Sequence, residues 1–204
     1  MTEKLRHTLR DSKVARWTAL AIVAFTMLTG YYLTDAMAPL KGLLEGQLQW
    51  NSSDFGFFTS AYGWFNVFLL MLIIGGIILD KMGVRFTGLM AAIIMVAGTS
   101  LKYWAVSTHA LDNTMWHLLF WDVKAQVFMA GLGFAIFGVG VEVAGITVSK
   151  IIVKWFKGKE LALAMGLEMA TARLGTALAI GTSVPVAKAF NNVATPILFA
   201  LILL

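Results

Sequence analysis

The sequence predicts an all-α membrane protein, and three observations lead to this fold class. The 204 residues are 59% hydrophobic and only 13% charged, whereas soluble domains carry about 45–50% apolar and about 25% charged residues. The mean hydropathy is +0.79. Five apolar segments also exceed the ~20 residues with which a helix crosses a ~30 Å hydrocarbon core at 1.5 Å per residue.

The apolar segments follow one another with short polar connections between them. We expect spans at residues 17–39, 57–79, 86–107, 126–153 and 160–189, and the start of a sixth at 193–204. The last segment is too short to cross a bilayer, so we expect an incomplete sixth helix and a chain that is part of a longer protein. Residues 1–16 are charged and predict a cytoplasmic tail, because the apolar run after them is too long for a signal peptide.

The distribution of Lys and Arg predicts the orientation of the chain. With the N-terminus inside, eleven of these residues lie inside and three outside. Cytoplasmic connections of membrane proteins carry an excess of Lys and Arg. The inside group comprises the tail, the connection at 80–85 and the connection at 150–159.

The outer connection at 108–125 is the longest and is rich in aromatic residues. We expect a short amphipathic helix at the membrane surface here, because the apolar residues would share one side of it. These residues are Leu111, Met115, Leu118, Leu119 and Trp121.

The composition and motif content exclude several classes of function. Without cysteine there are no disulfides and no thiolate metal sites. The sequence has no nucleophile–base pair, metal cluster or phosphate-binding loop, so we expect no enzyme, no metal and no cofactor. The bilayer explains the net charge of +5, and we therefore expect no nucleic-acid partner.

Glu142 and Arg173 are charged residues deep inside expected spans. A charge at mid-membrane costs at least ~2.5–3.5 kcal/mol, so such residues usually have a function. Rise per residue places Glu142 roughly 17 Å and Arg173 roughly 20 Å from the inner ends of their helices. Because the two helices are antiparallel, the residues lie at nearly the same depth. They predict a substrate site or an ion pair.

Two further polar pairs lie in the first two spans. Tyr31 and Asp35 are one helical turn apart, and so are Tyr62 and Asn66. A carboxylate beside a phenol suits an amine or a proton, so we add these four residues to the candidate substrate site. Lys102 lies near the outer end of its span, where we expect its side chain to extend to water.

The connection between the second and third spans is a short charged turn. Its polar backbone has no partners in hydrocarbon, so the turn lies at a membrane surface. The pattern Gly-x-x-x-Asp-Lys-x-Gly-x-Arg resembles the signature turn of the major facilitator superfamily. The matching residues are Gly76, Asp80, Lys81, Gly83 and Arg85. The resemblance implies that they form a conformational latch, in which Asp80 and Arg85 dock onto the other half of a carrier.

The resemblance also implies the architecture. Members of this superfamily have two six-helix halves, and this chain resembles the N-terminal one. Each half is a 3+3 inverted repeat, with the substrate site near the midplane between the halves. A second six-helix half is therefore an expected partner, beside the lipid bilayer and a small-molecule substrate.

A narrower resemblance connects the chain to the branch of this superfamily that contains a lysosomal dipeptide uniporter. It is carried by FGVGVE at 137–142, WFKGKEL at 155–161, GL at 166–167 and ARLG at 172–175. In that branch the Glu of the fourth helix and the Arg of the fifth belong to the substrate site, which implies this role for Glu142 and Arg173. Residues of the same type as in that branch are Tyr31, Asp35, Tyr62, Trp64 and Asn66.

The chain departs from the branch at two places. Phe134 stands where the fourth-helix motif usually has Arg, so we expect no proton coupling through that position. The outer connection at 108–125 is longer than the corresponding loop of the family. Both departures leave the substrate open.

We therefore expect a secondary transporter that moves a small charged or zwitterionic solute, such as a short peptide, by alternating access. Arg173 would bind a carboxylate. Glu142 would pair with Arg173 in the empty carrier or bind a substrate ammonium, so that each desolvated charge finds its opposite. Two alternatives stay open: a carrier of another organic anion that Arg173 alone binds, and a six-helix scaffold or receptor without transport. The expected location is a bacterial inner membrane, or alternatively a lysosomal membrane.

Overall fold

The computed structural model describes residues 12–112, 114–118 and 121–204. Most of the expected tail and Leu119 lie outside these ranges. Helices dominate the described part, which contains four helical stretches long and apolar enough to cross a membrane. The helices are α1 Lys13–Asp35, α2 Lys41–Leu48, α3 Ser52–Ser60, α4 Trp64–Phe68, α5 Met71–Ser107, α6 Ala125–Phe156, α7 Leu161–Ala189 and α8 Thr195–Leu203.

The first span begins at α1, where the Ser12 hydroxyl accepts a hydrogen bond from the Ala15 amide and caps the helix. The span continues through a 3-10 turn, η2 (Ala38–Leu40), into α2. The regular α-helix therefore ends at Asp35. The sequence had suggested an end at Pro39. This end matters for the site, because Asp35 occupies the last position of α1.

The second span is not the continuous helix expected at 57–79. It consists of α3, a 3-10 turn η3 (Ala61–Gly63), α4 and the first part of α5. The interruption falls between α4 and α5, where Leu70 has a positive φ of 51°. A non-glycine residue adopts this conformation only where its surroundings impose it, and so the apolar sequence around Leu70 gave no sign of the break.

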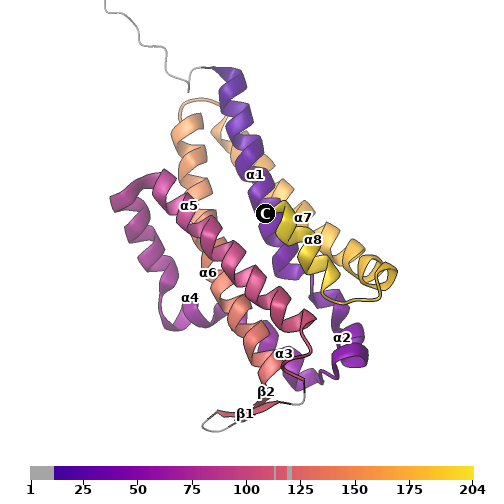
Figure 1. Cartoon of the computed structure of the whole chain (residues 1–204). Helices are drawn as coiled ribbons and strands as arrows, with labels where there is room; N and C mark the ends of the chain where they lie inside the picture. The colour runs from indigo at the N-terminus through magenta and orange to yellow at the C-terminus, as the bar shows by residue number, and fades with distance from the viewer. Residues whose placement is uncertain (1–11, 113, 119–120) are drawn as a thin grey trace, which may run out of the picture.

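The charged turn lies inside α5, between the second and third spans. Gly83 has φ 80° and ψ 172°, which interrupts the helical geometry. The chain reverses direction there and runs back along α6 (Figure 1). Glycine suits this position because L side chains rarely adopt such a φ.

The outer connection forms a β-hairpin, so the expectation of an amphipathic helix at 108–125 is wrong. β1 (Met115–Leu118) pairs antiparallel with β2 (Trp121–Lys124), with Met115 opposite Lys124. Burial alternates along β2, since Asp122 is exposed and Val123 is buried. Aromatic and β-branched residues with a period of two favour a strand over a helix.

The helices pack as two pairs, α5 with α6 and α1 with α7 (Figure 1). α1 and α7 run parallel, since Arg16 contacts Glu160 near their starts and Asp35 contacts Thr176 further along. Each pair joins one of the first three spans to one of the later spans. Glycine allows the close approach that membrane helices need. A Cβ on Gly98 would lie 2.3 Å from the Phe137 nitrogen, and one on Gly175 would lie 2.2 Å from the Leu28 carbonyl oxygen.

A charged contact joins the helices of each pair. The Arg16 Nη2 lies 3.2 Å from the Glu160 Oε2 and joins the starts of α1 and α7. The Lys150 Nζ lies 2.6 Å from the Asp80 Oδ1 and joins α6 to the turn in α5.

Candidate functional site

Glu142 is half-buried on α6 and is held by a residue of the second span. The Tyr62 hydroxyl donates a 2.7 Å hydrogen bond to the Glu142 Oε1. Gly138, one turn before Glu142, makes this approach possible, since a Cβ there would lie 2.4 Å from the Tyr62 carbonyl oxygen. The Tyr62 ring also packs against Phe134, with 5.3 Å between the ring centroids. The carboxylate therefore has a fixed orientation.

Arg173 lies on α7 with its guanidinium over the Tyr31 ring, 5.5 Å from the ring centroid. The residue is exposed. A guanidinium over an aromatic face is a cation–π contact, which leaves the N–H groups at its edge able to donate to a carboxylate. Arg173 is thus oriented by α1, the helix on which α7 packs.

Glu142 and Arg173 form no ion pair among the residues that the structure describes. Instead, each contacts a tyrosine: Glu142 contacts Tyr62, and Arg173 contacts Tyr31. The two contacts join α6 to η3 and α7 to α1. Sequence reasoning placed the two charges at one depth, but their contacts depend on helix rotation.

Asp35, like the contact between Tyr31 and Arg173, lies at the interface of α1 and α7. The Thr176 hydroxyl, three residues after Arg173, donates a 2.7 Å hydrogen bond to the Asp35 Oδ2. Thr176 is a contact that sequence reasoning missed, although its i+3 spacing from Arg173 is the signal that would have indicated a shared face.

Asn66 lies on α4, close to the break before α5. Both polar atoms of its amide are buried, and they have no hydrogen-bond partner among the described residues. An amide without partners is costly in apolar surroundings. This position therefore suits a polar group supplied from outside the described chain.

The residues of the expected latch lie in the turn inside α5. Asp80, Lys81 and Arg85 are exposed. Asp80 contacts Lys150, whose Nζ also donates to the Leu79 carbonyl oxygen at 3.3 Å. Sequence reasoning counted Lys150 as an inside charge but missed this contact, because the contact joins positions 70 residues apart. Gly76 is half-buried with open space around its Cα.

Lys102 corrects a prediction, because its side chain does not extend to water. The residue is 0% exposed, and its Nζ donates a 3.0 Å hydrogen bond to the Leu33 carbonyl oxygen. Rise per residue gives a position along the helix but not the direction in which a side chain points. The Lys102 side chain points inward, between α1 and α6.

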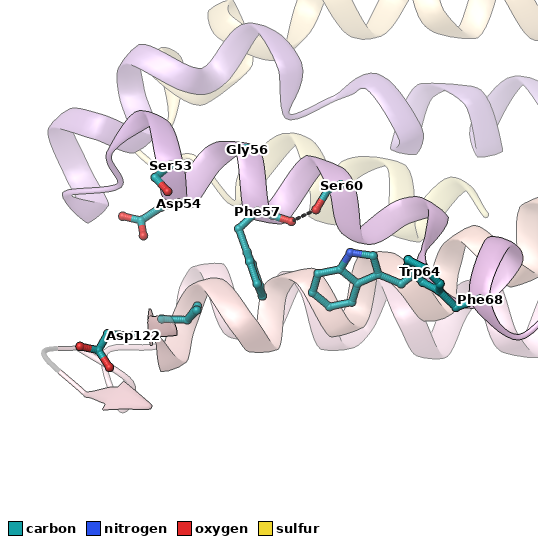
Figure 2. Close-up of a pocket in the computed structure, with 9 residues that line it drawn as sticks. Ser53, Asp54, Gly56, Phe57, Ser60, Trp64, Phe68 and Asp122 are labelled. Carbon is teal, nitrogen blue, oxygen red and sulfur yellow. Dashed lines mark hydrogen bonds between the residues drawn. The ribbon is translucent and has the colours of Figure 1, made fainter. Parts of the chain in front are cut away.

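A cavity of about 810 Å³ lies apart from these charges, between α3, α4 and β2. Figure 2 shows Phe57, Trp64 and Asp122 at its walls, and neither Glu142 nor Arg173 lines it. Asp54, its other carboxylate, lies 2.8 Å from the Lys124 Nζ. The charges of the candidate site therefore belong to a different part of the molecule.

Comparison with known proteins identifies the family. The model of the Major Facilitator Superfamily matches residues 20–204. The chain is 28% identical over 158 residues to the lysosomal dipeptide transporter MFSD1 of Danio rerio, and 26% identical over 162 residues to that of Homo sapiens. These alignments cover 77% and 79% of this chain, but it spans only about 30% of the length of these relatives. No solved structure is significantly similar to the chain.

The family match confirms the predicted fold class and the resemblance of the charged turn. A helical chain with apolar spans of membrane length is an integral membrane protein, and its relatives are named as transporters. The chain belongs to the Major Facilitator Superfamily.

Proposed function

We propose that the chain is the N-terminal half of a secondary transporter that moves a small zwitterionic solute, a short peptide being the favoured class. The observation that carries this proposal is the separate placement of the two charges. Arg173 is exposed over Tyr31, and Glu142 is oriented by Tyr62, with no ion pair between them among the described residues. Each is thus available for an opposite charge of a solute. The relatives named as dipeptide transporters support the choice of peptide.

In this mechanism Arg173 binds the carboxylate and Glu142 binds the ammonium of the solute. A charge that leaves water needs an opposite charge and hydrogen bonds in the site. Asp35, Tyr31, Tyr62 and Asn66 complete the polar lining that this chain contributes. The second six-helix half supplies the rest of the site and closes over it during alternating access.

We infer that the inner turn is the latch of this cycle. Asp80 already contacts Lys150 within this half, while Lys81 and Arg85 are exposed and can contact the second half. The positive charge at this end also supports a cytoplasmic orientation of the turn and of the N-terminus.

Uptake by the full-length carrier in proteoliposomes tests the proposal. We expect Arg173→Ala to lower kcat/KM for a dipeptide at least 100-fold, and Arg173→Lys to recover only part of it, because Lys lacks the planar donor fork. Lys188→Ala is the matched control, since Lys188 is an exposed cation near the end of α7. Uptake that survives Arg173→Ala would exclude this site assignment.

A second candidate is a carrier of another organic anion. The exposure of Arg173 favours it, as does the lack of a carboxylate partner for Arg173 among the described residues. Glu142→Gln separates the two. It should abolish uptake of a zwitterion, which needs both charges, but should spare uptake of a monocarboxylate that needs only Arg173. A scaffold or receptor without transport would show no uptake of either solute in the unmodified protein.

A further inference from the structure

Lys102 is the most completely buried charged side chain among the described residues. It is 0% exposed, compared with 2% for Arg16 and 7% for Glu168. Its ammonium lies 4.7 Å from the Phe134 ring centroid and 5.1 Å from that of Phe137. No carboxylate of the described chain lies within ion-pair distance of it. A buried cation without a carboxylate needs another explanation.

The hydrogen bond from Lys102 explains part of its burial. The Leu33 carbonyl that accepts it lies in the last turn of α1, which ends at Asp35. The last four carbonyls of a helix have no donor within the helix. In apolar surroundings such a group must find a partner, and a cation at this end also complements the helix dipole. Lys102 therefore caps α1 from another helix, α5.

The contacts of Lys102 reach both parts of the candidate site. Leu33 is two residues from Tyr31 and two from Asp35, which contact α7. On its other side, the Phe134 ring under the ammonium packs against Tyr62, the residue that orients Glu142. Lys102 touches neither Glu142 nor Arg173.

We propose that Lys102 is a positioning residue of the carrier. It fixes the end of α1 against α5 and α6, and thereby sets how Tyr31 and Asp35 lie against α7. The cation–π contacts hold the ammonium in place, since a desolvated cation is attracted to the face of an aromatic ring. The effect on transport rests on the proposed function, whereas the effect on helix position does not.

Disulfide crosslinking measures the helix position without any substrate. The chain contains no cysteine, so the pair Asp35→Cys and Thr176→Cys reports directly on the contact between α1 and α7. We expect rapid crosslinking when Lys102 is present. Lys102→Met keeps the volume but removes the charge and the donor, and should slow crosslinking at least 10-fold. Lys102→Arg, which keeps both, should recover most of the rate.

Thr99→Val is the matched control for this experiment. Thr99 is a buried residue of α5 one turn before Lys102, and its hydroxyl has no hydrogen-bond partner among the described residues. With Thr99→Val added, the Asp35→Cys and Thr176→Cys pair should crosslink at a rate within twofold of that without it. An unchanged rate in folded Lys102→Met would overturn the proposal. If Lys102→Met does not fold, Phe137→Leu removes one of the two rings, and an unchanged rate in that variant would overturn the proposal as well.

Dipeptide uptake with the native Asp35 and Thr176 gives the second readout. Lys102→Met should raise KM at least 10-fold with a smaller change in kcat, because the residue positions binding groups and does not touch the solute. A purely structural Lys102 would instead lower the melting temperature and leave KM unchanged, and that result would contradict the proposal. Slowed crosslinking in a protein that carries no zwitterion would reject the proposed function and keep the positioning role.

Discussion

The hydroxyl of Tyr62 is the group that orients the Glu142 carboxylate, through a hydrogen bond of 2.7 Å. A hydrogen bond to a charged group contributes about 1.5–3 kcal/mol. Removing the hydroxyl leaves the ring packed on Phe134 and frees the carboxylate to rotate. Removal of the Tyr62 hydroxyl therefore tests the hydrogen bond to Glu142 without changing the packing of the ring.

We expect Tyr62→Phe to insert and fold normally but to raise KM for the transported zwitterion about 10-fold. The size follows from the loss of one charge-assisted hydrogen bond, with about 1.4 kcal/mol for each factor of ten. Tyr103→Phe on α5 is the control, because no hydrogen bond to its hydroxyl is found in the described structure. A KM within twofold of the parent value would show that Tyr62 does not prepare Glu142 for binding.

The positions of the candidate site residues along their helices were predictable from the sequence, but their contacts were not. Depth along the helix and the cost of buried charge singled out Glu142 and Arg173, because both depend only on position in the chain. The tyrosine that each contacts depends on the rotation of helices about their axes. That rotation is fixed by packing between distant segments, so the same reasoning gave the wrong surroundings for Lys102.

At the scale of elements, the α5–α6 pair depends on glycine at the contact. A side chain on Gly98 would place its Cβ 2.3 Å from the Phe137 nitrogen. This neighbour is backbone and cannot rotate away. The two helices must therefore separate to accept any larger residue.

We expect Gly98→Ala to destabilise the protein by about 1–3 kcal/mol or more, as overpacking of a tight interface does. Thermal unfolding in detergent measures this loss. Gly181→Ala on α7 is the control, since nothing lies within 4 Å of a Cβ built there. Equal melting temperatures for the two variants would contradict the close approach of α5 and α6.

The long helices were predictable and the irregular elements were not. Unbroken apolar runs with small residues indicated α6 and α7 to within a few residues. The break at Leu70, where φ is positive, has no proline or glycine in the sequence to indicate it. The hairpin at β1 and β2 was missed because a short apolar run fits either period.

At the scale of the whole molecule, the distribution of Lys and Arg predicts the orientation in the membrane, and this prediction is open to a direct test. His109→Cys and Lys157→Cys place single thiols at exposed positions on opposite ends of the bundle. A membrane-impermeant maleimide should label the first in intact cells and the second only after permeabilisation. The reverse pattern would place the N-terminus outside.

The interface between α1 and α7 joins residues that are synthesised at different times. Asp35 and Thr176 are 141 residues apart, and Arg16 and Glu160 are 144 apart. Ribosomes add about 5–20 residues per second, so α1 waits roughly 7–29 s in the membrane before these partners are synthesised. During that interval Asp35 lacks its contact with Thr176, and Arg16 lacks its contact with Glu160. A chain that terminates early, before α7, therefore leaves an incompletely satisfied helix for the quality-control machinery of the membrane to recognise.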